Sequence, residues 1–121
     1  MPFDPEPYAE GIRRLNQREL KRTRDHAHAA RRDAHYLARR IGEDDPNVSR
    51  VYLFGSLLED TPRRPNFDID LAIEGGDVHR AMERAEGIDR HVDIVCLHLL
   101  PRHVQRRIRE TGVVLFERVQ A

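Results

Sequence analysis

The segment that most restricts the fold spans residues 67–73 and reads FDIDLAI. Its alternating side chains are typical of a β-strand, in which residues i and i+2 point to the same face of the sheet. Asp68 and Asp70 therefore share one face, and Ile69 and Leu71 share the other. Two carboxylates a few ångströms apart repel each other, and burying them without a partner is costly. A chain that buries both aspartates must place a compensating group beside them.

A divalent cation is the simplest compensating group. Mg²⁺ is a hard ion that binds carboxylate oxygens and keeps open positions for water or phosphate. Asp93, in the apolar run HVDIVCL, offers a third carboxylate from a separate strand. If that strand lies beside the 67–73 strand, Asp68, Asp70 and Asp93 converge. Three carboxylates are enough to hold two Mg²⁺ ions for an in-line displacement at phosphorus.

The residues before the intervening loop suit phosphate binding. Residues 51–54, VYLF, are expected to form a short buried strand that ends in Gly55-Ser56. Glycine lets the backbone approach a phosphate closely, and a serine hydroxyl with nearby N–H groups can donate hydrogen bonds to phosphate oxygens. We therefore expect Gly55 and Ser56 to bind the phosphates of a nucleoside triphosphate. Because no P-loop lysine accompanies them, the metal ions would have to neutralise most of the phosphate charge.

The first third of the chain predicts a long helical segment. From Tyr8 to Ile41 there is no proline, and small or apolar residues recur every three or four positions, as on one face of a helix. The residues of this face are Ala27, Ala30, Ala34, Leu37 and Ile41. One long helix or two joined helices fit the pattern, and Gly42 is expected to end it. Residues 1–7 contain three prolines and are expected to be extended or disordered.

The remaining residues predict a small α/β (α+β) fold with a mixed sheet, flanking helices and the long N-terminal helical extension. The expected strands and helices, in chain order, are 51–54, 67–73, a helix capped by Asp77 that runs to Ala85, 91–97, a helix from Pro101 to Thr111, and 113–116. We expect the chain to divide into an extension over residues 1–42 and a domain over residues 43–121.

Charge and composition limit the partners. The chain has 21 basic and 21 acidic residues, so its overall balance does not point to a polyanion. Residues 11–41 carry ten basic against three acidic residues. Aromatic residues do not alternate with these charges, which favours association with a protein, or with a second copy, over nucleic acid. The single Cys96 excludes an internal disulfide. No signal peptide or membrane-spanning stretch is recognisable, so we expect a cytoplasmic protein.

Taken together, Gly55-Ser56, an eleven-residue loop, Asp68-Ile69-Asp70 and the later Asp93 resemble the signature of the DNA polymerase β-type nucleotidyltransferase superfamily. The small size and the C-terminal RETGVVLFE are similar to the minimal nucleotidyltransferases of prokaryotes, many of which are paired with HEPN-domain toxins. The resemblance covers residues 48–118 and implies the palm sheet of that superfamily.

The resemblance also implies a role for each residue. Asp68 and Asp70 would bind Mg²⁺, and Asp93 would bind metal and align or deprotonate the attacking hydroxyl. Gly55 and Ser56 would bind the β- and γ-phosphates. The reaction would transfer a nucleoside monophosphate, AMP from ATP, to a hydroxyl and release pyrophosphate.

In characterised relatives the acceptor can be a tyrosine of the toxin, so the resemblance implies an antitoxin that modifies a HEPN-type partner. Two alternatives stay open: a degenerate relative that neutralises the toxin only by binding, through its N-terminal helix, and a small-molecule enzyme akin to the aminoglycoside nucleotidyltransferases. The residues after Ser56 depart from the small and basic ones usual in relatives, so Arg63 or Arg64 is a candidate for the missing positive charge.

Each motif also has a simpler explanation. The two aspartates could lie on an exposed edge strand, with both carboxylates in water. Gly55-Ser56 could form an ordinary turn, and Asp93 could form a salt bridge with a nearby arginine. The nucleotidyltransferase interpretation therefore rests on the combination of the motifs.

Overall fold

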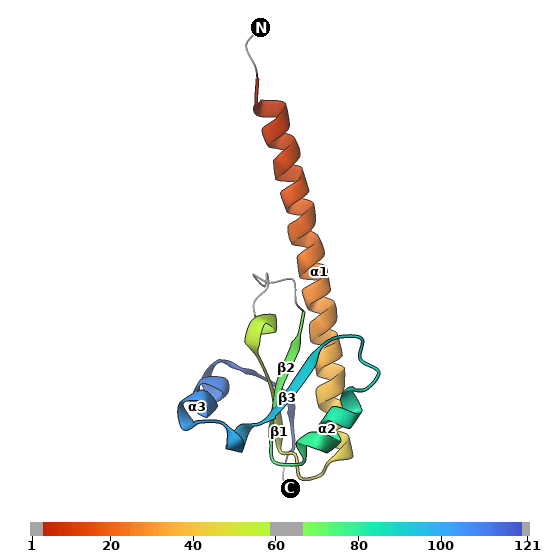
Figure 1. The fold of residues 1–121 in the computed structure, drawn as a ribbon, viewed down its shortest axis with the longest axis vertical. Helices are drawn as coiled ribbons and strands as arrows, with labels where there is room; N and C mark the ends of the chain where they lie inside the picture. The colour runs from red at the N-terminus through yellow and green to blue at the C-terminus, as the bar shows by residue number, and fades with distance from the viewer. Residues whose placement is uncertain (1–3, 59–66, 120–121) are drawn as a thin grey trace.

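A computed structural model describes residues 4–58 and 67–119, apart from the side chain of Ser56. Its longest element is α1 (Glu6–Asp44), a single continuous helix that projects far beyond the rest of the molecule (Figure 1). One helix, and not two, therefore spans the N-terminal segment. No helix in the described part of the chain is long and apolar enough to cross a membrane.

Both expected ends of this helix were wrong. The helix begins at Glu6 because prolines are tolerated at its start, where an N–H has no intrahelical partner: Pro5 is the N-cap and Pro7 lies in the first turn. At the other end the helix passes through Gly42 and runs to Asp44. The ring of Phe116 packs against Gly42. A Cβ at Gly42 would lie 2.3 Å from ring carbons, so the glycine provides room for packing and does not end the helix.

The sheet has the strand order β3-β2-β1-β4 and is mixed, as expected. Its strands are β1 (Arg50–Phe54), β2 (Ile69–Glu74), β3 (Val92–Cys96) and β4 (Val113–Glu117). β1 pairs antiparallel with β2 and with β4, and β2 pairs parallel with β3. The predicted sequence of elements is confirmed, although β2 begins two residues later than expected, so that Asp68 immediately precedes the strand.

The helices cover the two faces of the sheet unequally (Figure 1). The C-terminal half of α1 and α2 (Val78–Ala85) pack on one face, over a core of aliphatic residues that includes Leu37, Ile41, Leu71 and Ile73. The other face is partly covered by α3 (Arg102–Thr111), and its smaller cluster contains Tyr52, Ala72, Leu97 and Ile108. The division of the chain at residue 42 stays a prediction.

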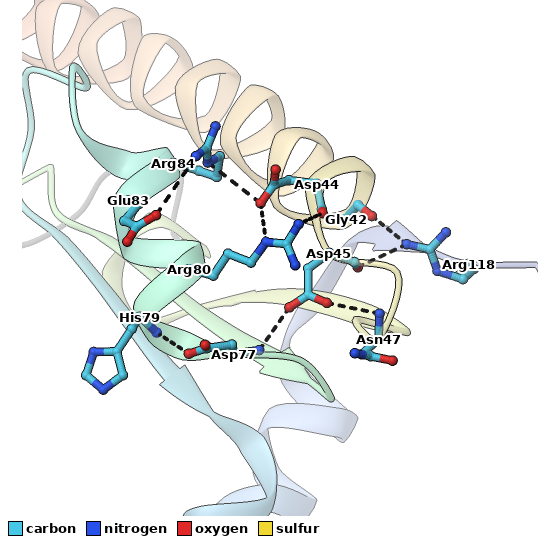
Figure 2. Close-up of polar contacts among 10 residues, drawn as sticks. All are labelled: Gly42, Asp44, Asp45, Asn47, Asp77, His79, Arg80, Glu83, Arg84 and Arg118. Atoms are coloured by element: carbon cyan, nitrogen blue, oxygen red, sulfur yellow. Dashed lines mark hydrogen bonds and ion pairs between the residues drawn. The ribbon is translucent and has the colours of Figure 1, made fainter.

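A polar cluster fastens α1 to α2 at the end of β2 away from Asp70 (Figure 2). Its centre is Asp45, only 4% exposed, whose carboxylate accepts hydrogen bonds from the backbone N–H groups of Asp77 (2.9 Å) and Asn47 (3.0 Å). These bonds, led by the one from Asp77, lower the pKa of Asp45 below its ordinary value of 3.8. Beside it, Arg80 Nε donates to Asp44 Oδ2 at 2.8 Å.

Candidate functional site

Three neighbouring strands place one residue each in a single row across the sheet. Phe54 on β1 lies opposite Asp70 on β2, and Asp70 lies opposite Asp93 on β3. Residues in register point to the same face, and adjacent strands lie about 4.8 Å apart, so the two aspartates are close neighbours. Ala72, two residues after Asp70, belongs to the cluster under α3, so the row lies on the α3 face. The condition for bringing the carboxylates together, that the Asp93 strand lies beside the Asp68-Asp70 strand, is met.

Gly55 brings the backbone that follows β1 against this row. It has a φ of +83°, and a Cβ built on it would lie 2.4 Å from Asp70 Oδ2. A side chain at this position would therefore displace the carboxylate. Gly55 opens the short 3₁₀ helix η1 (Gly55–Leu58), whose second residue is Ser56. The Ser56 side chain and both Arg63 and Arg64 lie outside the described part of the structure.

The carboxylates share one electrostatic environment. Asp70 is half-buried, and burial raises its pKa above the ordinary value of 3.8. The negative charges of Asp93 and Asp68 raise it further, while His91 acts in the opposite direction. Asp68 is therefore near enough to Asp70 to interact with it, although it lies just before β2.

Asp93 has a partner that sequence reasoning missed. His91 Nε2 lies 3.2 Å from Asp93 Oδ2, and both side chains are more than half exposed. The side-chain contact found for Asp93 in the described part of the chain is with this histidine, which carries a charge only when protonated, and not with an arginine. His91 and Asp93 have the i, i+2 spacing of residues on one face of a strand. This spacing was the signal in the sequence that could have indicated their contact.

The donor chemistry fits Mg²⁺. Among residues 4–58 and 67–119, no three His, Cys, Asp or Glu side chains already form a ready-made metal site. Carboxylates that repel each other turn apart, and Asp93 is turned toward His91. The negative charge gathered around Asp70 is nevertheless what a hard divalent cation relieves. The missing side chain at Gly55 leaves the space that the Asp70 carboxylate itself occupies. Asp68, Asp70 and Asp93 are the residues that could hold the ions.

Comparisons with known proteins bear on the fold and the family of the chain. The family model described as "Polymerase beta, Nucleotidyltransferase" matches residues 38–121, so it leaves most of α1 outside. A solved toxin-antitoxin complex with AMP-PNP is 26% identical, with a TM-score of 0.56, over 69% of this chain and 73% of that chain. No curated protein matches the chain.

Two further solved structures show the same fold. A mutant MntA toxin-antitoxin complex is 23% identical with a TM-score of 0.55, and covers 69% of this chain and 73% of its own. The toxin-antitoxin pair MntA-HepT is 22% identical with a TM-score of 0.52, and the match covers 72% of this chain and 73% of that chain. Together with the fold and the family match, they confirm the resemblance inferred from the motifs. The chain belongs to the Polymerase beta nucleotidyltransferase family and is a nucleotidyltransferase.

Proposed function

We propose that this chain is an antitoxin-type minimal nucleotidyltransferase that transfers AMP from ATP to a hydroxyl of a HEPN-type toxin. The observation that carries the proposal is the row of Asp70 and Asp93 on adjacent strands with Gly55 against Asp70. A toxin-antitoxin complex solved with AMP-PNP is 26% identical to the chain, and this supports both the donor and the type of partner.

The residues divide the work of the reaction. Asp68, Asp70 and Asp93 hold two Mg²⁺ ions, which when bound neutralise the triphosphate and polarise the α-phosphate. Gly55 and Ser56 hold the β- and γ-phosphates through backbone N–H groups and the serine hydroxyl.

Asp93 aligns the acceptor hydroxyl and accepts its proton. The hydroxyl oxygen forms a bond to the α-phosphorus as the bond from that phosphorus to pyrophosphate breaks, and the bonding pair leaves with pyrophosphate. His91 keeps the Asp93 carboxylate oriented on its strand.

The projecting part of α1 is the surface we propose for the partner. Tyr8, Ile12 and Leu15 are 67%, 58% and 60% exposed, and their i, i+4, i+7 spacing forms one stripe on the helix. An apolar stripe of this kind suits packing into a groove of another protein or against another helix. A homo-oligomer through the same stripe would leave the toxin to bind elsewhere. Changing Ile12 and Leu15 to serine should abolish the complex with the toxin in a pull-down experiment.

The decisive test is label transfer from α-³²P-ATP to the purified HEPN-type partner in the presence of Mg²⁺. We expect the wild type to label the partner and Asp70→Asn to leave it unlabelled. The matched control, Asp77→Asn, changes an exposed aspartate that follows the other end of β2, and because asparagine also caps a helix it should transfer normally. Neutralisation of the toxin without transfer would establish the binding-only alternative, and labelling of a small molecule alone would establish the third.

A further inference from the structure

A cavity begins where β1 ends. It has a volume of about 420 Å³, within the range of small-molecule sites, and lies between the end of β1, η1 and α3. Its described lining residues are Phe54, Gly55, Leu58, Val104, Arg107, Ile108 and Thr111. Phe54 stands opposite Asp70 in the sheet register, so the cavity starts one strand away from the carboxylates, on the same face of the sheet.

The lining of this cavity suits a flat aromatic ring with a polar edge. Four of the side chains are apolar, namely those of Phe54, Leu58, Val104 and Ile108. The charged side chain among the described lining residues is Arg107, whose guanidinium makes no ion pair or hydrogen bond within residues 4–58 and 67–119. A guanidinium can stack on a ring or donate hydrogen bonds to its edge.

Thr111 adds an acceptor beside this donor. Arg107 and Thr111 are four residues apart and therefore lie on one face of α3. The Thr111 hydroxyl donates its proton to the Arg107 carbonyl oxygen at 2.7 Å, which leaves the lone pairs of Oγ1 to accept from a ligand. The cavity thus offers donors from Arg107 next to an acceptor from Thr111.

We propose that this cavity binds the adenine base of the nucleotide, an inference that rests on ATP being the donor. Along one edge, adenine presents the N7 acceptor next to the N6 amino donor, which complements Arg107 and Thr111. Guanine presents two acceptors along the same edge, and its O6 would face Thr111 Oγ1 without a proton between them. Arg107 and Thr111 are therefore specificity-determining residues for the base, separate from the carboxylates and from Gly55.

Calorimetric titration of the full chain in Mg²⁺ tests this assignment with three probes: a non-hydrolysable ATP analogue, the matching GTP analogue, and tripolyphosphate, which has no base. We expect Arg107→Ala to weaken binding of the ATP analogue about tenfold and to leave tripolyphosphate unchanged. Thr111→Val should reduce the preference for the ATP over the GTP analogue by about the same factor. The control Arg109→Ala, an exposed arginine on the same helix, should change neither.

The outcomes separate this assignment from the proposed function. If Arg107→Ala weakens tripolyphosphate and the ATP analogue equally, Arg107 contacts phosphate and the base site is wrong, while the transferase stands. An unchanged ATP affinity in that variant overturns the base site as well. If the wild type binds none of the three probes, the proposed function fails and the base site fails with it. Should Arg107→Ala not fold, Val104→Phe, which fills the cavity, must lower ATP-analogue affinity and spare tripolyphosphate.

Discussion

Replacing Gly55 by alanine separates the catalytic role of this position from its structural role. Gly55 has a φ of +83°, a conformation that costs a residue with a Cβ about 1–2 kcal/mol. The added Cβ would also meet Asp70 Oδ2 at 2.4 Å. A carboxylate at the end of a side chain can rotate away at little cost, so the contact adds little to the loss of stability. Rotation would, however, move a proposed metal ligand out of the row.

Two measurements follow from this difference. The free energy of unfolding of Gly55→Ala should fall by about 1–2 kcal/mol, which lowers the melting temperature of a chain of this size by about 4–8 °C. Label transfer should fall about a hundredfold or more, since a displacement of about 1 Å in a reacting group has that effect.

Gly87→Ala is the matched control. Gly87 has a φ of +92°, and a Cβ at this position would meet nothing within 4 Å. This variant should lose the same stability and keep its transfer rate. Equal transfer rates in the two alanine variants would refute the placement of Gly55 against a functional Asp70.

The remaining expectations concern Gly42 with its control Gly11, Asp45 and Asp70. Gly42→Ala should lower the free energy of unfolding by about 1–3 kcal/mol because the new methyl group meets the Phe116 ring, whereas Gly11→Ala, with open space around it, should increase the helix content measured by circular dichroism. Asp45→Ala should cost about 2–4 kcal/mol, since two backbone N–H groups lose their acceptor. Because the pKa of Asp45 is lowered on folding, its contribution to the free energy of unfolding is present above pH 3.8 and is lost as the pH falls through its folded pKa. The free energies of unfolding of wild type and Asp45→Asn, measured as the pH is lowered, should therefore converge at low pH. Because the pKa of Asp70 is raised, Mg²⁺-dependent nucleotide binding should fail on acidification at a pH above that of an ordinary aspartate, and a loss only below pH 3.8 would contradict this.

Local patterns were sufficient to predict most elements. The alternation in residues 67–73, the cap at Asp77 and the spacing of small residues in 27–41 each report their own backbone, and the strands and helices they predict are present. The ends of α1 were missed because they depend on tertiary contacts and on how prolines act at a helix start. Nothing near Gly42 in the sequence shows that Phe116, far along the chain, occupies the space of its missing side chain.

The residues of the candidate site are proposed from the sequence and stay a prediction, whereas their geometry required the structure. The types and spacing of Gly55, Asp68, Asp70 and Asp93 indicate nucleotidyl transfer, but only the strand register shows that Asp70 lies opposite Asp93. The cavity beside Phe54 also depends on where α3 crosses the sheet, which no local pattern encodes.

The central claim is that Asp68, Asp70 and Asp93 together hold the metal ions of a nucleotidyltransferase. The most direct measurement is a crystal structure of the chain soaked with Mn²⁺ and AMP-PNP, with the anomalous difference map calculated at the manganese edge. Two anomalous peaks coordinated by these three carboxylates, with the triphosphate beside Gly55, are the predicted result. Nucleotide bound elsewhere, or bound next to Gly55 without a metal ion on any of the three aspartates, would contradict the claim.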